Sequence, residues 1–278
     1  MSETSVTDET NFNEELWHTI FAEGHPLLIE KQFSFRQQGA SPRCKLCLAP
    51  FSGVSAHQTE IPGPSNRNPR YCSLCDSFIR ENPGGAKVNM SMVFVDIRGS
   101  TKYSEELDLR EYVRLINQFY ARTTKIFVET DGFMMDVIGD EVFALYPAGF
   151  SGVSENEQST QQRECLAAQK ALQAVKKLAP LGKGSPPDSL PFGVSFHTAS
   201  VYIGTVRGAE EGISDVRIWG PEVNRAARMC AKAPAGQAII SEAALTMAKD
   251  LDTELYRAEE NISLKGISQH IALRSYTP

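Results

Sequence analysis

The pattern of apolar and polar positions changes character near Val88 and divides the chain into two parts. Residues 1–15 are acidic and polar, and we expect this N-terminus to be disordered. Scattered apolar positions then predict one or two short helices. From Pro42 to Pro83 the chain is rich in Pro, Gly, Ser, Asn and Cys, and the Gly-Gly dipeptide that follows is typical of a boundary. The pattern therefore predicts a small helical and cysteine-rich module over residues 16–85.

Strand and helix periods alternate from residue 86 onward. The apolar run VNMSMVFVDI predicts a strand that ends in an acid, and helical spacing predicts helices over residues 109–130 and 164–179. FMMDVI and EVFALY predict a hairpin, PFGVSFHTASVYIGTV predicts two further strands, and Pro221 begins another helix. This order predicts an α+β fold over residues 86–278: a ferredoxin-like βαββαβ core with helices packed on one face of an antiparallel-rich sheet.

Length and charge restrict the classes of function. The 278 residues suffice for one catalytic core and a small extra module. The formal net charge of −6, without a basic run, argues against nucleic-acid binding but leaves a nucleotide substrate open. No apolar run approaches the roughly 20 residues of a spanning helix, and the N-terminus has no apolar signal region. We therefore expect a cytoplasmic protein without a membrane span.

Four of the six cysteines form two CxxC pairs, CKLC and CSLC, separated by residues 48–71. In a cytosolic protein such pairs indicate a metal site before they indicate disulfides. Four thiolates at this spacing fit a tetrahedral structural zinc, with these candidate ligands: Cys44, Cys47, Cys72 and Cys75. Reduced redox pairs and an iron–sulfur site are the alternatives. A closed four-sulfur site has no open position for catalysis, so we expect it to stabilise, to regulate or to guide dimerisation. His57 and His197 are expected to be structural.

Two acids are predicted to meet at the end of the first strand. Asp96 ends that strand, Asp140 lies at the hairpin tip, and the predicted order makes their strands neighbours. Two close carboxylates repel unless cations lie between them, and a pair of divalent metal ions about 3.5–4 Å apart forms a clamp for phosphoryl chemistry. Gly99, Ser100 and Thr101 open a helix after the first acid, where backbone N–H groups can bind phosphates. The alternative is that Asp140 is only a turn residue and Asp96 only a helix cap.

These segments also carry a resemblance to a known family. FVDIRGST and VIGDEVFALYP resemble the two metal-binding segments of class III adenylate and guanylate cyclases, and the resemblance extends from about Val88 to Tyr276. It implies two divalent metal ions (Mn²⁺ or Mg²⁺) bound by Asp96 and Asp140, with a backbone carbonyl from Ile97. It also implies a nucleoside triphosphate substrate, a 3′,5′-cyclic nucleotide product and diphosphate.

The segment IWGPEVNRAARM resembles the other hallmark of this family. Because Pro221 starts a helix, Asn224 and Arg228 stand one turn apart on one face and can reach one ligand together. The resemblance implies that Asn224 orients the ribose, that Arg228 stabilises charge on the α-phosphate, and that Lys265 binds the terminal phosphates. It also implies a head-to-tail homodimer with composite active sites, in which one protomer supplies the metal ligands and the other supplies Asn224 and Arg228. On the residues alone, Arg228 is equally an ordinary surface arginine and Lys265 a solvated loop residue.

The base-reading positions depart from the adenylate cyclase pattern. Adenylate cyclases place a lysine three residues before the hairpin glycine and an Asp or Thr three residues before the glycine of the helix motif, whereas this chain has Asp136 and Arg217. An acceptor and a donor in these places suit uracil or guanine, because a mismatched base leaves buried polar groups unpaired. The length of Arg217 favours the smaller ring, and the pyrimidine cyclases of bacterial anti-phage signalling also lack the adenine-reading pair. We therefore expect UTP conversion to cUMP first and GTP conversion to cGMP second. The alternative is that Asp136 and Arg217 form an ion pair that reads no base, and the nearby Asp215 leaves this pairing open.

Two classes of function remain. The first is an enzyme whose cyclic product acts, in anti-phage defence or elsewhere, on a cyclic-nucleotide-binding effector, with cAMP from an ordinary adenylate cyclase as a variant. The second is a catalytically silent, nucleotide-binding regulatory domain. Retention of all four catalytic positions favours the enzyme. Ser200 replaces a phosphate-binding arginine of some members, so we expect phosphate contacts on Arg98 or Lys102.

Overall fold

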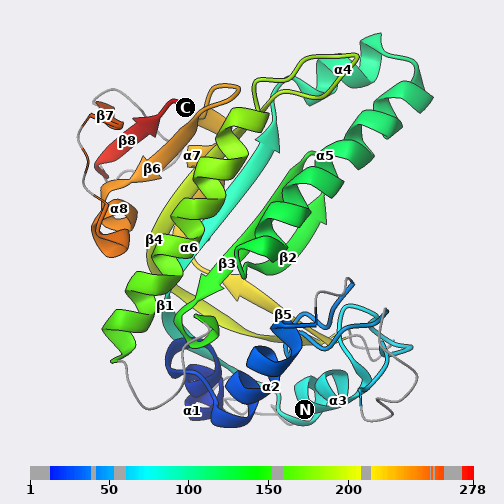
Figure 1. The fold of residues 1–278 in the computed structure, drawn as a ribbon, viewed down its shortest axis with the longest axis vertical. Coiled ribbons are helices and arrows are strands. Elements are labelled where there is room, and N and C mark those ends of the chain that lie inside the picture. The colour runs from blue at the N-terminus through cyan, green and yellow to red at the C-terminus, as the bar shows by residue number, and fades with distance from the viewer. Residues whose placement is uncertain are drawn as a thin grey trace, which may run out of the picture.

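A mixed sheet of eight strands lies at the centre of the computed structural model (Figure 1), which describes residues 13–38, 42–52, 61–151, 159–207, 214–250, 252, 254–259 and 271–278. The strands are β1 (Gly85–Ile97), β2 (Phe133–Ile138), β3 (Glu141–Pro147), β4 (Phe192–Arg207), β5 (Ser214–Trp219), β6 (Ala238–Ser241), β7 (Tyr256–Glu259) and β8 (Leu273–Tyr276). The helices are α1 (Glu14–His18), α2 (Pro26–Arg36), α3 (Ser73–Glu81), α4 (Ser100–Glu106), α5 (Leu109–Glu129), α6 (Thr160–Leu181), α7 (Pro221–Lys232) and α8 (Glu242–Ala248). A π-helical turn (Thr19–Glu23) follows α1, and a 3-10 turn (Ala148–Phe150) follows β3.

The order of the strands confirms the predicted α+β fold. Along the sheet they run β2-β3-β1-β4-β6-β8-β7, and β5 pairs with β4 outside this path. The pairs among β2, β3, β1 and β4 are all antiparallel, which with α5 and α6 gives the ferredoxin-like βαββαβ arrangement. β6 then joins β4 in parallel. Consequently β1 lies between β3 and β4, and its C-terminal end is next to the β2–β3 hairpin.

The segment predicted to form two strands is one long strand, β4, and this part of the prediction was wrong. β4 pairs with β1 along the whole length of β1. Its first half also pairs with β6, at Val194–Phe196, and its second half pairs with β5, at Tyr202–Arg207. No glycine or proline interrupts the chain between Ser195 and Tyr202, so nothing there makes a turn. The change of partner along a continuous strand replaces the expected break.

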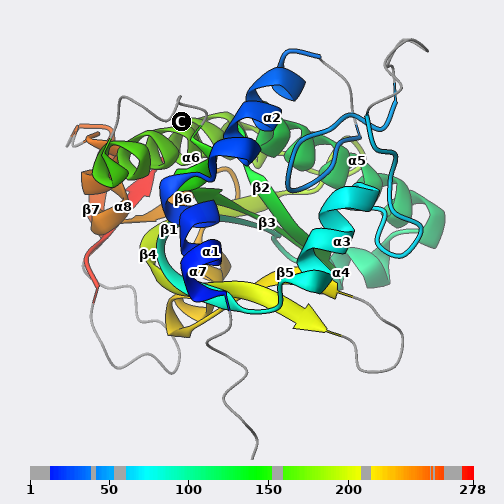
Figure 2. The same ribbon diagram turned by 90° about the horizontal axis from the view of Figure 1, so that it is seen from below.

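Helices cover both faces of the sheet, which corrects the prediction that they pack on one face (Figure 2). Val93, Val95 and Ile97 of β1 point into a core shared with α5, α6 and α8. Met92 and Phe94 alternate to the other side and enter a second core shared with α7 and the N-terminal module. By the same alternation, Asp96 lies on the α7 side of the sheet.

The N-terminal module forms the predicted short helices and packs directly on the second face of the sheet. α1 begins at Glu14, just inside the segment for which disorder was expected, while residues 1–12 lie outside the described residues. Trp17 is fully buried, and its indole N–H donates to the carbonyl of Asn82 over 3.0 Å. The Phe21 ring lies edge-on to Phe133 of β2, with 5.7 Å between the ring centroids. The core of the module is therefore continuous with that of the sheet.

His197 ties β4 to α7 and α8. Its Nε2 lies 2.8 Å from a carboxylate oxygen of Glu222, and its Nδ1 lies 2.9 Å from the Ser241 hydroxyl that caps α8. Arg225 already binds both oxygens of Glu222, over 2.6 and 2.7 Å. Burial therefore prevails over the attraction of Glu222 and lowers the pKa of His197 below its ordinary value of 6.5. The neutral imidazole donates through Nε2 and accepts from Ser241.

Stability should depend on His197 at mildly acidic pH. Below about pH 6.5 the unfolded chain binds a proton that the folded protein excludes, so the free energy of unfolding should fall by up to about 1.4 kcal/mol per pH unit. Urea unfolding of a His197→Gln variant between pH 7.5 and 5.5 should show a smaller decrease than the unchanged protein. His18→Gln, at a half-exposed position of α1, is the matched control. Equal slopes for all three proteins would contradict this assignment.

Candidate functional site

The fold brings the two acids of the predicted metal site to the same end of the sheet, where β1 ends and β3 begins. β1 pairs with β3 so that Asp96 lies opposite Glu141, the residue after Asp140. The backbone N–H of Ile97 donates to the carbonyl of Asp140 over 3.1 Å, which fixes the hairpin tip against the end of β1. Gly139 has a φ of 61° in this tip, a conformation that favours glycine. The two strands are therefore neighbours, as the predicted order required.

The first turn of α4 lies beside the acids. The Arg98 guanidinium pairs with the carboxylate of Asp96 and also donates to its backbone carbonyl over 3.1 Å. The Ser100 hydroxyl donates to the carboxylate of Asp140. Gly99 adopts a left-handed conformation, with a φ of 73°, and turns the chain into the helix. Ser100 thus joins this turn to the acid pair, and the assignment of Gly99, Ser100 and the exposed Thr101 to phosphate binding stays a prediction.

Sequence reasoning missed a third acid, Glu141. Burial, followed by the charges of Asp96 and Asp140, raises the pKa of Glu141 to about 7. Burial also raises the pKa of Asp96, with Asp140 adding to the rise and Arg98 opposing it. The run Gly-Asp-Glu at the hairpin contains the signal, because the residue opposite Asp96 follows from the strand pairing.

The donor set fits divalent cations. Three carboxylates in mutual repulsion, with backbone oxygens nearby, form the hard oxygen environment that Mg²⁺ and Mn²⁺ prefer. A cation between Asp96 and Asp140 would offset both the burial that mainly raises the pKa of Asp96 and the smaller contribution from Asp140. The assignment of Asp96, Ile97 and Asp140 as ligands stays a prediction.

The predicted asparagine and arginine stand together on α7, and in the described part of the chain no hydrogen bond or ion pair joins them to the acids. Asn224 is exposed and Arg228 is half-buried, one helical turn apart. Within the part of the chain that the structure describes, neither side chain has a hydrogen bond or ion pair. The C-terminal end of α7 does approach the acids, since Arg98 donates to the carbonyl of Ala231 over 2.8 Å.

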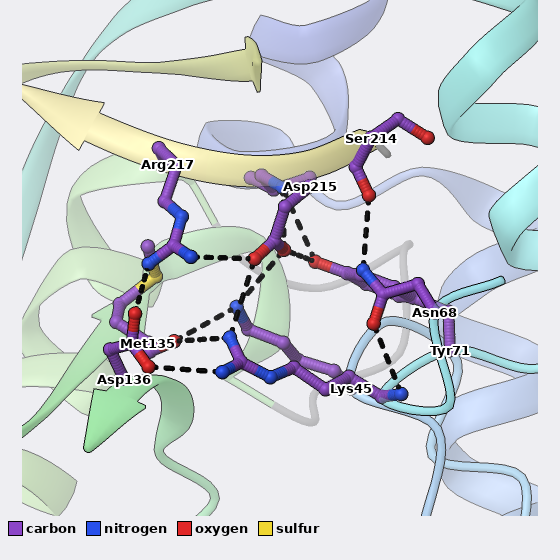
Figure 3. Close-up of polar contacts among 10 residues, drawn as sticks. Lys45, Asn68, Tyr71, Met135, Asp136, Ser214, Asp215 and Arg217 are labelled. Atoms are coloured by element: carbon purple, nitrogen blue, oxygen red, sulfur yellow. Dashed lines mark hydrogen bonds and ion pairs between the residues drawn. The ribbon is translucent and has the colours of Figure 1, made fainter. Parts of the chain in front are cut away.

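The candidate base-reading residues form an ion pair, the alternative raised for them from the sequence. Nη1 of Arg217 pairs with the carboxylate of Asp136, and Nη2 lies 3.1 Å from Asp215 (Figure 3). Arg70 of the N-terminal module lies 3.0 Å from Asp136 and 3.3 Å from Asp215. Two acids of the sheet are thus shared by two guanidinium groups from different parts of the chain.

Two further residues of the module complete this network. The Tyr71 hydroxyl donates to Asp215 over 2.6 Å, and Nζ of Lys45 lies 3.7 Å from the same carboxylate (Figure 3). Lys45 also stands over the ring of Phe133, 4.7 Å from its centroid. Burial lowers the pKa of Lys45 to about 8, against the opposing attraction of Asp215. Sequence reasoning gave no sign of these contacts with the module.

The four paired cysteines gather at one point. Their four Sγ atoms all lie within 4.8 Å of one another, and all four are free thiols. Sγ of Cys47 and Sγ of Cys72 are 3.7 Å apart, too far for a disulfide. Hydrogen bonds among the thiols lower the pKa of Cys44 and Cys72 and raise that of Cys47 and Cys75. This cluster fits one tetrahedral cation, which would allow all four to be thiolates.

Some predicted residues lie outside these groups or outside the described part of the chain. Lys265 and His57 lie outside the described residues. Ser200 is exposed on β4, and the exposed Lys102 lies 3.8 Å from Glu106 on α4. Of the residues expected to take over phosphate contacts, only Arg98 lies at the acids. Among the described helices, none combines the length and the apolar character needed to cross a membrane.

Comparisons with known proteins agree with this geometry. The sequence model of the family described as Adenylate and Guanylate cyclase catalytic domain matches residues 85–275. The chain is 30% identical over 142 residues to an adenylate cyclase of Anabaena cylindrica, an alignment that covers 50% of this chain and 26% of that protein. It is 26% identical over 200 residues to an uncharacterized protein of Mycobacterium tuberculosis, covering 70% of this chain and 33% of the relative. The chain thus spans about a third of the length of such curated relatives, or less.

Solved structures show the same fold. The adenylyl cyclase CyaB from P. aeruginosa superposes with a TM-score of 0.52 at 22% identity, covering 70% of this chain and 96% of that one. The guanylyl cyclase Cya2 superposes with a TM-score of 0.51 at 21% identity, covering 69% and 93% of the two chains. Both matches support the assignment of the sheet and its helices.

Proposed function

Since the chain belongs to the adenylate and guanylate cyclase catalytic domain family, we propose that it closes a nucleoside triphosphate into a 3′,5′-cyclic nucleotide and releases diphosphate. The meeting of Asp96 and Asp140 at the end of β1 carries this proposal. A catalytically silent domain would need neither acid, and it would need no cation on α7.

Each group of predicted site residues has a role in this reaction. Bound by Asp96, Asp140 and the carbonyl of Ile97, two divalent ions would supply activation of the ribose 3′-hydroxyl and neutralisation of the diphosphate. The turn from Gly99 to Thr101 holds phosphate oxygens through backbone N–H groups. Lys265 binds the terminal phosphates.

The residues of α7 act on the ribose and the α-phosphate. Asn224 orients the sugar, and Arg228 stabilises the negative charge that develops during ring closure. The lack of partners for both side chains, within the described part of one chain, supports a head-to-tail homodimer in which each site combines the acids of one protomer with α7 of the other.

The substrate base carries a ring N–H beside a carbonyl oxygen, which makes UTP the first choice of substrate and GTP the second. The donor at Arg217 favours a base with a carbonyl oxygen at the position where adenine and cytosine carry an amino group, and its length favours the smaller uracil ring. A role in anti-phage signalling, and an effector that binds the cyclic product, stay predictions that rest on the resemblance alone.

Product analysis tests this proposal. The protein is incubated with Mn²⁺ and each of the four triphosphates, and cyclic nucleotide is identified by mass spectrometry beside released diphosphate. We expect UTP to give the fastest reaction and GTP the next. ATP and CTP should react at least about tenfold more slowly than UTP, because a buried polar mismatch costs at least the free energy that corresponds to this factor. ATP as the best substrate would overturn the assignment of the base. No product from any triphosphate would favour a regulatory domain.

A further inference from the structure

Three side chains of the cysteine-rich module reach the candidate base-reading pair. Lys45 lies inside the first CxxC pair, and Arg70 and Tyr71 directly precede the second. The backbone N–H of Lys45 donates to the carbonyl of Arg70 over 2.8 Å, so the two segments are joined beside the thiol cluster. A cation held by the four thiols would therefore fix where Arg70 stands.

These side chains bind the same two acids that Arg217 binds. The Oδ1 atom of Asp136 accepts from Arg70 over 3.0 Å, and its Oδ2 atom accepts from Arg217. Asp215 accepts from both guanidinium groups and from the Tyr71 hydroxyl. Every oxygen of the two carboxylates thus has a charged or hydroxyl donor within the protein, and charge-assisted hydrogen bonds of this kind are strong.

The accessible part of the network is cationic. The side chains of Asp136 and Asp215 are only 12% and 6% exposed, whereas those of Arg70 and Arg217 are 45% and 33% exposed. A ligand that enters from solvent meets guanidinium N–H donors before it meets an acceptor, because guanidinium groups only donate. Uracil and guanine present a carbonyl oxygen to such donors at the position where cytosine and adenine carry an amino group.

We propose that Arg70 is a third specificity-determining residue for the substrate base, and that it donates together with Arg217 to a carbonyl oxygen of that base. This inference rests on the proposed cyclase function and deepens it. It changes the role expected of Asp136, whose carboxylate positions the two guanidinium groups and does not itself accept from the base. Asp215 and Tyr71 likewise hold the network in place and do not contact the base. The thiol cluster acts on base selection through the place that it gives to Arg70.

Substitution of Arg70 separates base recognition from the other parts of the site. In Arg70→Ala, kcat/KM for the preferred carbonyl-bearing triphosphate should fall roughly 10- to 100-fold, the cost of losing a hydrogen bond to a charged group, and kcat/KM for ATP should change much less. Arg70→Lys keeps the positive charge but loses the paired N–H donors of the guanidinium group. It should therefore restore part of the preference for the carbonyl-bearing triphosphate. Inhibition by inorganic tripolyphosphate, which has no base, should be unchanged. Arg67→Ala removes an exposed cation from the same module and is the matched control.

Binding is measured in parallel, so that the result does not depend on turnover. Calorimetry with the α,β-methylene analogues of UTP, GTP and ATP, which cannot be cyclised, should show tighter binding of a carbonyl-bearing analogue to the unchanged protein and loss of that preference in Arg70→Ala. An unchanged preference in the folded variant would overturn the inference, as would an equal loss for all three analogues and tripolyphosphate. If the unchanged protein turns over no triphosphate, the proposed function fails, while the binding preference still decides the role of Arg70.

Discussion

An Asp140→Asn variant is expected to form cyclic nucleotide about three orders of magnitude more slowly than the unchanged protein, because a divalent ion contributes several kcal/mol of transition-state stabilisation and each 1.4 kcal/mol is tenfold in rate. Its thermal unfolding temperature should stay nearly the same. Asparagine can still accept from the Ser100 hydroxyl, and the backbone carbonyl at this position still accepts from Ile97. Removal of one negative charge also reduces the repulsion of Asp96 and Glu141.

The matched control is Glu106→Gln, which removes an exposed negative charge from the end of α4. It should keep both activity and stability. Rates are measured over a range of Mn²⁺ and Mg²⁺ concentrations, since a weakened site can be filled by excess metal. If Asp140→Asn and Glu106→Gln have the same rate at every concentration, Asp140 is not a metal ligand.

The same variant tests where the second half of the site comes from. Arg228→Ala should also be inactive alone. Equal amounts of the Asp140→Asn and Arg228→Ala chains, unfolded and refolded together, should recover about a quarter of the full activity, because half of the dimers then have one intact site of two. Failure to recover activity would contradict the head-to-tail arrangement but not the metal assignment.

Local patterns were sufficient to predict the elements that hold the acids. β1, the β2–β3 hairpin, α5 and α7 each have a regular period and a clear start or end, so their positions followed from the sequence. The meeting of Asp96 with Asp140 then followed from topology, because the ferredoxin-like order places β3 beside β1. Glu141 could have been added by the same reasoning, since antiparallel pairing places it opposite Asp96.

The contacts between distant irregular segments could not be predicted in this way. Arg70 lies in a stretch without periodicity, 66 positions before Asp136, and no local pattern indicates that the two meet. The cysteine spacing predicted that Cys44, Cys47, Cys72 and Cys75 gather, but not the face of the sheet on which they do so. Packing of Trp17 and Phe21 against that face determines the placement, and burial of this kind depends on surfaces that only the whole fold creates.

Replacement of Cys72 by serine is expected to be the most damaging change to stability. Cys72 is fully buried, caps α3 and contributes one of the four gathered sulfurs. A structural zinc contributes folding energy directly, and the loss of about 3 kcal/mol lowers the unfolding temperature of a domain of this size by roughly 10 °C. The unchanged protein should contain one zinc per chain by elemental analysis, and Cys72→Ser should contain much less. Cys165→Ser, at another buried thiol, is the matched control and should keep the metal.

The loss of the metal should also weaken the choice of base, because Arg70 is held by the segment that leads to Cys72. In contrast, Asp96 and Asp140 are fixed by β1 and β3, so a slow and less selective cyclase should remain at temperatures where the variant is folded. A double variant, Cys72→Ser with Arg70→Ala, decides whether the thiol cluster affects base discrimination only through Arg70. If the cluster acts on the base through Arg70, the double variant should discriminate among triphosphates no worse than Arg70→Ala alone, since residues in one network are not additive. Independent, multiplying losses would show that the cluster influences the base pocket through another part of the module.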